Sequence, residues 1–378
     1  MFLLEHDAKT LLAAHGAAMP AGALLESVDF DTATLPAPPW MIKAQIPVGG
    51  RGKAGLIRTA NSADELRAHA RDILGKVHKG MTVRSCRVET RVGGADETYL
   101  SFMLDPVSAG VRIMVAAQGG VEIETLAATK GAVRNEVAMP RLHDLNACWA
   151  RLTAGFAPHV AAAINSAGPA LARAFLEGEL SLLEINPLFV HKDGTWTAGD
   201  AKVVTNDDAI YRQPVLRALL EQRAAAYPEA YRKHRHGCDY VVVDPDGEIG
   251  LLTTGAGLSM MLIDELRATG LKPYNFLDVR TSGLRGDATR LVNVIEWIAE
   301  GKRVRVLLVN IFAGITDLKE FAQLLVEALA RVPHIKLPVV ARLVGTNLEA
   351  ARDFLATHGI PVSTELGVAL EHVRRKLA

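Results

Sequence analysis

A lysine followed by a glycine-rich basic loop is the first feature of this sequence that suggests chemistry. Lys43 lies in the apolar run 39–46, and Gly49-Gly50-Arg51-Gly52-Lys53-Ala54-Gly55 follows it. Glycines let backbone N–H groups approach phosphate oxygens, and lysine and arginine offset the charge of a polyphosphate. The loop is not a Walker A motif, because the G-x-x-x-x-G-K-[ST] spacing is absent. The alternative is a flexible surface loop, and composition alone does not separate the two.

A carboxylate and an amide lie inside the apolar run LSLLEINPLFV. Glu184 and Asn186 are two positions apart, so in a strand both side chains point to one face. A turn and a second strand after this run predict a hairpin that returns Asp200 beside them. Oxygen ligands of this kind suit Mg²⁺, which also keeps waters and substrate phosphates. The alternative is a polar pair on a solvent-facing strand, but the apolar neighbours favour a site.

Strand-to-helix turns in the second half of the chain form a third candidate. They are Thr254-Gly255-Ala256-Gly257, Arg280-Thr281-Ser282-Gly283 and Ala313-Gly314-Ile315-Thr316. In a doubly wound sheet, turns at the carboxyl ends of the strands hold ligands. Helix N-termini there supply unpaired N–H groups and about half a positive charge each. One such turn is a weak signal, and ordinary connecting turns are the alternative for all of them.

The elements that must position the first two groups form a mixed α+β unit. We predict helices over 4–16, 61–75 and much of 143–178, and antiparallel strands over 83–91, 98–104 and 111–117. A charged helical connector over 213–237 ends in RKHRHG. We therefore predict a first domain over residues 1–237 and a second over 238–378.

The second domain has a different order of predicted strands and helices. Short apolar strands (YVVVD, GLLTTG, NFLDVR, VRVLLVNIF, PVVARLVG and PVST) alternate with helical stretches. Repeated strand–helix units predict an open, doubly wound parallel sheet with helices on both faces.

Composition excludes several classes of protein. The 378 residues carry 42 Lys+Arg and 42 Asp+Glu, so a globally basic nucleic-acid binder is not expected. No run approaches the ~18 apolar residues of a membrane span, and the N-terminus lacks the features of a secretory signal. The three cysteines are far apart and odd in number, which fits a reducing compartment. We expect a cytoplasmic protein without a membrane or nucleic-acid partner.

An ordered set of motifs resembles a known family. The segments are KAQIPVGGRGKAG, GGVEIE at 119–124, LSLLEINPL, IYRQP at 210–214, GEIGLLTTGAGLSM, NFLDV and LVNIFAGIT. Together they resemble the beta subunit of succinyl-CoA synthetase and the related malate–CoA ligase beta subunit, over nearly the whole chain. The resemblance implies an ATP-grasp domain followed by a flavodoxin-like CoA-ligase domain. It also implies an alpha subunit that binds CoA and carries a phosphorylatable histidine, in an αβ or (αβ)₂ complex.

The same resemblance implies roles for residues at matching positions. Contacts with ATP or GTP fall on Lys43, Gly50, Arg51, Gly52, Glu89, Val92 and Glu97, and Arg51 also offsets charge on the transferring phosphoryl group. Mg²⁺ falls on Asn186 and Asp200, and Glu184 matches an acid that interacts with the partner's histidine. The part of the site that receives the acid's carboxylate and the partner's phosphohistidine falls on Asn275, Gly314, Ile315 and Thr316.

The implied reaction is stepwise. The nucleotide phosphorylates the partner's histidine, the phosphoryl group passes to a small carboxylic acid, and the thiol of CoA displaces phosphate. No Gly-His-Ala-Gly motif occurs in this chain, so we expect it to need its partner.

The sequence departs from the family near the expected acid site. Arg280-Thr281-Ser282-Gly283 replaces a glycine run, Asp317-Leu318-Lys319 replaces Arg-Cys-Asp, and Thr254 replaces Asn. In the first domain, Ala201 replaces the commoner glycine after the Mg²⁺ aspartate, as it does in the malate enzymes. An arginine brings a full charge and about five donors, against about half a charge for a helix end. We predict that Arg280 or Arg285 holds an extra anionic or polar group on a succinate-like acid. A surface arginine in a longer loop is the alternative.

Two other functions compete with this one. An ATP-grasp carboxylate–amine ligase is disfavoured by the CoA-ligase motifs of the second half. A nucleotide-binding subunit without turnover is disfavoured by the presence of Lys43, Asn186 and Asp200.

Overall fold

The computed structural model describes residues 1–120, 131–280, 286–314 and 316–378. In the first part the strands are β1 (Gly22–Leu25), β2 (Trp40–Ala44), β3 (Ile57–Ala60), β4 (Val77–His78), β5 (Met81–Thr82), β6 (Cys86–Thr90), β7 (Asp96–Asp105), β8 (Gly110–Ala116), β9 (Val133–Ala138), β10 (Leu180–Val190), β11 (Trp196–Ala198) and β12 (Lys202–Thr205). The helices are α1 (Glu5–Ala14), α2 (Ala63–Ile73), α4 (Leu142–Asn146), α5 (Trp149–Leu152), α6 (Pro158–Glu177) and α7 (Pro214–Gln222). Short 3₁₀ turns cover Thr32–Thr34 and Asp207–Arg212.

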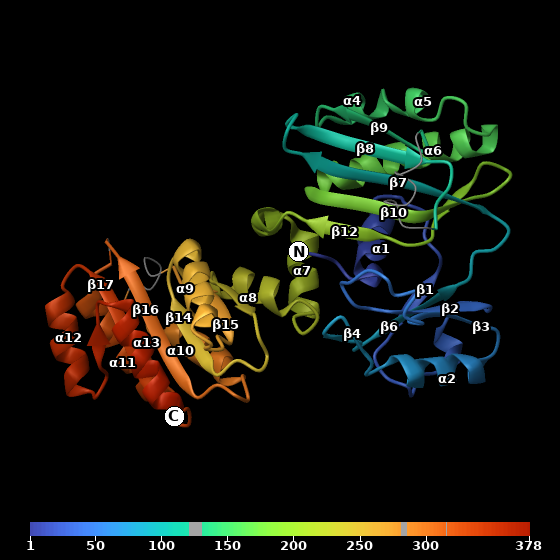
Figure 1. Cartoon of the computed structure of the whole chain (residues 1–378). Coiled ribbons are helices and arrows are strands. Elements are labelled where there is room, and N and C mark those ends of the chain that lie inside the picture. Colours follow the sequence, from blue (N-terminus) through green and yellow to red (C-terminus); the bar gives the residue numbers. More distant parts are fainter. Residues whose placement is uncertain (121–130, 281–285, 315) are drawn as a thin grey trace. The chain divides into compact units, whose positions relative to one another are not determined.

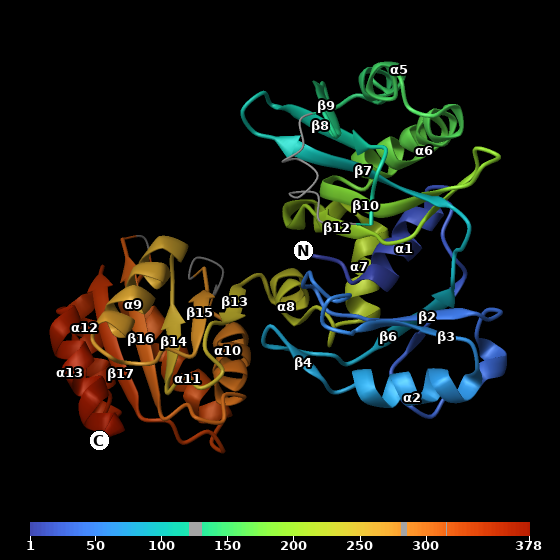
Figure 2. The same ribbon diagram turned by 45° about the vertical axis from the view of Figure 1, so that its right-hand side comes forward.

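One antiparallel sheet of this part has the strand order β1-β6-β2-β3, and α2 lies beside it (Figure 2). Ser62 begins α2, because its hydroxyl accepts a hydrogen bond from the backbone N–H of Glu65 at 3.2 Å. The helix buries Leu66, Ala70 and Ile73. The predicted helix over 61–75 is therefore confirmed, and β2 carries Lys43 in this sheet.

The other antiparallel sheet has the order β11-β10-β7-β8-β9, and β12 also pairs with β10. Figure 1 shows α4, α5 and α6 gathered beside it. Phe102 of β7 packs edge-on against Trp149 at 5.7 Å between ring centroids, and stacks on Phe175 at 5.6 Å. Gly168 allows this approach, because a Cβ there would lie 2.4 Å from the Trp149 ring. The helical zone predicted over 143–178 is thus three helices, of which α5 and α6 pack against β7.

Several short strands were not predicted. β9 has three successive polar residues at its centre (VRNEVA) and lies at the end of its sheet, where both faces stay partly exposed. β1 is four residues long and has no alternation of apolar and polar side chains. Edge strands and very short strands lack the burial that produces a readable pattern.

The second part has strands β13 (Asp239–Val242), β14 (Ile249–Thr253), β15 (Asn275–Asp278), β16 (Val306–Ala313), β17 (Val339–Gly345) and β18 (Val362–Ser363). Its helices are α8 (Pro228–His236), α9 (Ala256–Ala268), α10 (Thr289–Ala299), α11 (Leu318–Arg331), α12 (Leu348–Thr357) and α13 (Leu366–Leu377). β14-β16-β17-β18 are parallel, and β15 adjoins the free edge of β14 through a parallel bridge between Ile249 and Pro273. This order is that of a flavodoxin-like sheet, as predicted.

One strand differs from the prediction of a wholly parallel sheet. β13 pairs with β15 in the antiparallel sense. A parallel arrangement with β14 needs a crossover of about a dozen residues or more, and only residues 243–248 separate β13 from β14. β13 therefore closes the edge of the sheet.

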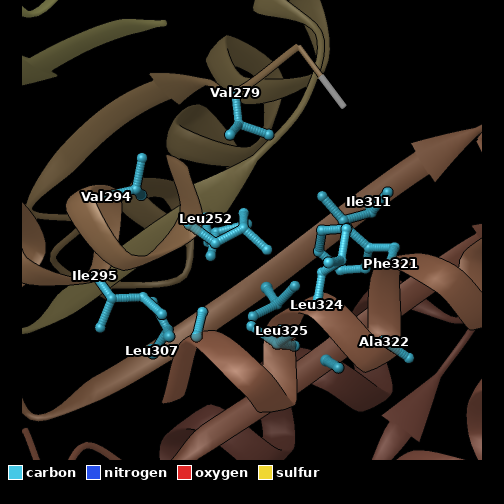
Figure 3. Packing of buried hydrophobic residues seen from close by; sticks show 14 of the residues in the cluster. Leu252, Val279, Val294, Ile295, Leu307, Ile311, Phe321, Ala322, Leu324 and Leu325 are labelled. Carbon is cyan, nitrogen blue, oxygen red and sulfur yellow. The ribbon is translucent and has the colours of Figure 1, made fainter. Parts of the chain in front are cut away.

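Helices cover both faces of this sheet. Alternate residues of β16 enter two different cores: Val306 and Leu308 pack with α9 and α13, whereas Leu307, Val309 and Ile311 pack with α10 and α11. Figure 3 shows the second of these cores, with Val294 and Ile295 of α10 and Phe321, Leu324 and Leu325 of α11 around the strands. The period of two along the strand confirms that the sheet is buried on both sides.

Internal packing divides the chain into Met1–Leu219 and Leu220–Ala378. α8 explains why this division precedes residue 237: the guanidinium of Arg232 lies 5.0 Å from the ring centroids of both Tyr240 and Trp297. A domain boundary at residue 237 stays a prediction. The three cysteines are buried and free. Within the described ranges, every helix is too short or too polar to serve as a membrane span.

Candidate functional site

Lys43 lies in a buried cluster of charges in the first unit. Its ammonium is 2.8 Å from Glu5 Oε1 and 2.7 Å from Glu89 Oε1, and it donates to the carbonyl of Gly199 at 2.7 Å. Only 7% of the side chain is exposed. Burial opposes the charge, but Glu5, Glu89 and Asp200 outweigh it and raise the pKa of Lys43. The lysine is therefore cationic at neutral pH.

Arg51 connects the glycine-rich loop to the predicted metal ligands. One nitrogen, Nη1, lies 2.8 Å from Glu5 Oε2 and donates to the carbonyl of Ala44 at 3.0 Å. The other, Nη2, lies 2.8 Å from Asp200 Oδ2. Burial works against the charge, but Asp200 and Glu5 raise the pKa of Arg51 nonetheless. The structure therefore brings the basic loop and Asp200 together.

Asn186 and Asp200 lie opposite each other on neighbouring segments of the second sheet. The residue pairs that flank them are Glu184–Lys202 and Leu188–Ala198. Asn186 is midway between the flanking residues of β10, and Asp200 is midway between those of the returning segment. The hairpin thus returns the acid beside the amide, as the sequence predicts, and Glu184 and Asn186 are both half-buried.

The side-chain oxygens of this pair are suitable for a divalent cation. Asn186 Oδ1 accepts from the backbone N–H of Gly120 at 2.8 Å, and Asp200 Oδ1 accepts from that of Ala201 at 2.8 Å. Each of these oxygens has two lone pairs. An amide and a carboxylate are hard oxygen ligands of the type that Mg²⁺ takes alongside water and phosphate. The residues therefore fit the ion, and metal binding itself stays a prediction.

Glu89 is a counter-ion at the base of this cluster. Its Oε2 lies 2.6 Å from Arg87 Nε and 2.8 Å from Lys9 Nζ. Burial raises the pKa of a carboxyl, but Lys43 and Lys9 overcome this and lower the pKa of Glu89. Because the side chain is buried among cations, it fixes their positions; a direct contact with a nucleotide stays a prediction.

Glu5 and Lys9, both on α1, are the members of the cluster that sequence reasoning missed. We predicted only a helix over residues 4–16 here. A glutamate four residues before a lysine is typical of an exposed helical ion pair, with nothing to indicate burial. In the structure both side chains are at most 2% exposed and lie 2.9 Å apart. Three opposing cations outweigh burial and hold the pKa of Glu5 well below its usual value.

Gly199 supplies a backbone acceptor to both buried lysines. Its carbonyl accepts from Lys9 at 2.8 Å as well as from Lys43. A Cβ at this position would lie 2.3 Å from the ring of Phe189 and 2.9 Å from the carbonyl of Pro187. Glycine is therefore required for the segment to approach β10 this closely.

The other predicted nucleotide contacts lie nearer the surface. Gly50 and Gly52 are exposed in the loop, and Gly50 has a left-handed φ of 83°. Val92 is half-buried between β6 and β7, and Glu97 is exposed on β7. Their contact with a nucleotide stays a prediction, and residues 121–124 of the GGVEIE motif lie outside the described residues.

The carboxyl edge of the parallel sheet in the second unit is held by short polar contacts. Asp278 Oδ1 accepts from the backbone N–H of Gly255 at 2.8 Å and of Arg280 at 3.2 Å. Asp317 caps α11 by accepting from the N–H of Lys319 at 2.8 Å. Gly314 is exposed and Thr316 half-buried beside this helix start. Ile315, residues 281–283 and Arg285 lie outside the described residues.

Asn275 and Arg280 are placed differently from the expectation of an acid contact. Asn275 is fully buried; its amide accepts from Leu251 N at 2.8 Å and donates to Leu251 O at 2.9 Å. It therefore bridges β15 to β14 within the sheet. Arg280 has a left-handed φ of 51°, and its guanidinium pairs with Asp239 of the edge strand at 2.9 Å. A contact of either residue with an acid stays a prediction.

Comparison with known proteins agrees with this architecture. The ATP-grasp domain model matches residues 2–190, and the CoA-ligase model matches residues 252–374. Succinate–CoA ligase [ADP-forming] subunit beta of Chloroflexus aurantiacus is 39% identical over 376 residues, covering 96% of each chain. The protein of that name from Desulfurococcus amylolyticus is 33% identical and covers 98% of this chain and 97% of its own.

A solved structure extends the likeness to the fold. ATP citrate lyase from Methanothrix soehngenii, in complex with citrate and coenzyme A, matches with a TM-score of 0.75 at 18% identity, covering 98% of this chain and 99% of that one. At this identity the likeness concerns the fold alone. The sequence relatives carry the stronger statement: the chain belongs to the succinate–CoA ligase [ADP-forming] beta subunit family, whose members are acid–thiol ligases with an ATP-grasp and a CoA-ligase domain.

Proposed function

We propose that this chain is the nucleotide-binding beta subunit of an ADP-forming acid–CoA ligase that uses ATP or GTP with Mg²⁺. One observation carries the proposal: Lys43 and Arg51 form a single, largely buried cluster of ion pairs with Asp200, which lies opposite Asn186. Phosphoryl transfer depends on fixed positive charge and on oxygen ligands for a divalent ion. Both requirements are met within one unit of the chain.

Each side chain has a role in this proposal. Asn186 and Asp200 would hold Mg²⁺, which when bound offsets charge on the phosphate oxygens. Lys43 and Arg51 bind the phosphates and stabilise negative charge on the group in transfer. Glu184, on the same face of β10 as Asn186, accepts a hydrogen bond from the imidazole of the partner's histidine and so orients the ring.

The reaction then proceeds in three steps. A ring nitrogen of the partner's histidine attacks the terminal phosphorus, forming a P–N bond as the bond to the departing diphosphate breaks. An oxygen of the acid's carboxylate takes the phosphoryl group, which frees the histidine and gives an acyl phosphate. The sulfur of CoA attacks the carbonyl carbon, a C–S bond forms, the thiol proton is released, and inorganic phosphate leaves.

The second unit serves the acid in this proposal. The turns after β14 and β16 present helix starts at the sheet edge where the strand order reverses, which is where α/β sheets bind ligands. The substrate is a small carboxylic acid, succinate-like or bearing an extra anionic or polar group. The alpha subunit supplies the histidine and the CoA site in an αβ or (αβ)₂ complex.

The test is to produce the chain together with its alpha-type partner and assay ADP release with a panel of small acids. We expect release to require Mg²⁺, CoA and both chains, and to depend strongly on the acid. Replacing ATP by GTP in the same assay identifies the nucleotide.

Other results would contradict the proposal. Release that needs an amine instead of CoA would indicate a carboxylate–amine ligase. Nucleotide binding without turnover, for every acid and with the partner present, would indicate a non-catalytic subunit.

A further inference from the structure

Two buried lysines, Lys9 of α1 and Lys43 of β2, contact the same three acceptors. The Lys9 ammonium lies 2.9 Å from Glu5 Oε1, 2.9 Å from Glu89 Oε1 and 2.8 Å from Gly199 O. Lys43 contacts these same atoms at 2.8, 2.7 and 2.7 Å. The two ammonium groups therefore neutralise one set of oxygens from two sides.

This arrangement matters because Lys43 has no donor to spare among these contacts. An ammonium has three N–H donors, and Glu5, Glu89 and Gly199 take all three. A phosphate can bind Lys43 only if at least one of these contacts is given up. Without a second cation, that exchange would leave a buried carboxylate oxygen unpaired, which is strongly unfavourable.

We propose that Lys9 is a positioning residue of the nucleotide site: it keeps Glu5, Glu89 and the Gly199 carbonyl in place when Lys43 turns to the triphosphate. The inference rests on the proposed nucleotide-binding function and extends it to a residue that does not touch the ligand. Lys9 has only 1% of its side chain exposed, so it serves the site from behind Lys43.

The charges of the cluster agree with this role. Four cations (Lys9, Lys43, Arg51 and Arg87) surround three carboxylates (Glu5, Glu89 and Asp200). One positive charge is therefore in excess among these seven side chains, and it is available for an anion. Burial, with repulsion from Lys43 and Arg87, lowers the pKa of Lys9, whereas Asp200 contributes to the raised pKa of Lys43. Lys9 has 1% of its side chain exposed and Lys43 has 7%, so Lys9 is the more deeply buried of the two cations.

The experiment measures the affinity of the full-length chain for a non-hydrolysable ATP analogue with Mg²⁺ by calorimetry. Lys9→Met keeps the length of the side chain and removes its charge. We expect the dissociation constant to rise about 10- to 100-fold, the range typical of outer-shell residues that orient a binding site. Arg112→Met is the matched control, because it also deprives a buried carboxylate, that of Asp105, of its cation. It should lower the unfolding temperature without changing the affinity.

A double variant separates charge balance from packing. Adding Glu5→Gln to Lys9→Met removes one carboxylate with the missing cation and restores the excess positive charge. We expect this variant to recover part of the lost affinity. Lys9→Arg retains a cation with several donors, so its dissociation constant for the analogue should lie within about threefold of the wild-type value. If Lys9→Met does not fold, Lys9→Arg is the variant that tests the proposal.

The inference is overturned if Lys9→Met binds the analogue as tightly as the wild type does. It is also overturned if the double variant binds no better than Lys9→Met, or if Lys9→Arg binds as weakly, because packing alone would then explain the loss. Failure of the wild-type chain to bind the analogue is a different result: it would remove the proposed function, and this inference with it.

Discussion

The two candidate regions of this chain are built in opposite ways. In the first unit, charged side chains from residues 5 to 200 converge, and each is buried or half-buried against an opposite charge. At the sheet edge of the second unit, backbone turns and helix starts are exposed, while Asn275 is directed into the sheet and Arg280 toward the edge strand. In the proposed function, phosphate chemistry would thus rely on fixed side-chain charge, and acid recognition on a framework of turns.

This difference has a physical basis. A triphosphate carries several charges, and a buried site can bind it only if equally fixed cations are already in place. A small acid needs only a few donors, and helix N-termini supply them without any particular side chain. The first region should therefore tolerate few substitutions, whereas the second should be sensitive mainly to changes that disturb the sheet.

The largest expected effect is that of Lys43→Met on turnover by the complex with the alpha subunit. Removing this cation takes charge stabilisation from the phosphoryl group and leaves Glu5 and Glu89 with one partner fewer. We expect ADP release to fall by about 10²–10³-fold. The control is Lys192→Met, which removes an exposed lysine paired with Asp96. Equal turnover by the two variants would show that buried charge is not what distinguishes the first region.

The second prediction concerns the ion pair between Arg51 and Asp200. The guanidinium occupies Asp200 Oδ2, which is one of the proposed metal ligands. Arg51→Gln should therefore raise the affinity for Mn²⁺ in the absence of nucleotide and lower the affinity for the Mg²⁺–nucleotide complex about tenfold. Electron paramagnetic resonance of Mn²⁺ measures the first quantity directly. If Arg51→Gln weakens both, the arginine assists metal binding and does not compete with it.

Asn275 provides the third prediction, for the second region. Asn275→Ala leaves the N–H and the carbonyl of Leu251 without partners in a buried strand, which costs about 2–5 kcal/mol of unfolding free energy. Urea denaturation measures this loss. Asn275→Asp keeps the acceptor but places a buried carboxyl against the carbonyl of Leu251, to which it can donate only when protonated, so at neutral pH it should lose at least as much. A variant with unchanged stability but a raised KM for the acid would instead assign Asn275 to substrate binding.

Comparing Asn186 with Asn275 shows what the sequence could predict and what it could not. Both are amides inside apolar strands, and both were assigned to sites by the same resemblance. Asn186 is half-buried, opposite Asp200, whereas Asn275 replaces a backbone partner between two strands. The strands themselves were predictable from hydrophobic runs, but the direction of a polar side chain depends on which neighbour lacks a partner. That neighbour is set by strand order, a long-range property.

Lys9 is a second residue whose surroundings could not be predicted from the local sequence. The helix that carries it was predicted, together with its end near Gly16, where the structure has a left-handed glycine. The burial of Lys9 was not predicted, because its acceptors come from residues 89 and 199, far along the chain. The glycine-rich loop and the hairpin were recognisable because their signals are local. A charge that acts through distant partners has no local signal.

The smallest expected effects come from the pair between Arg280 and Asp239. The Arg280 side chain is 54% exposed, and ion pairs of this kind contribute little to stability, so Arg280→Ala should leave the unfolding temperature nearly unchanged. If Arg280 binds the acid, the same variant raises the KM for the acid and leaves the KM for the nucleotide unaltered. Asp239→Asn sharpens the test, because it releases the guanidinium from the edge strand and should then lower the KM for an acid with an extra anionic group. Should neither variant change that KM, the second region would recognise its acid through backbone turns alone, and the contrast with the side-chain cluster of the first region would be complete.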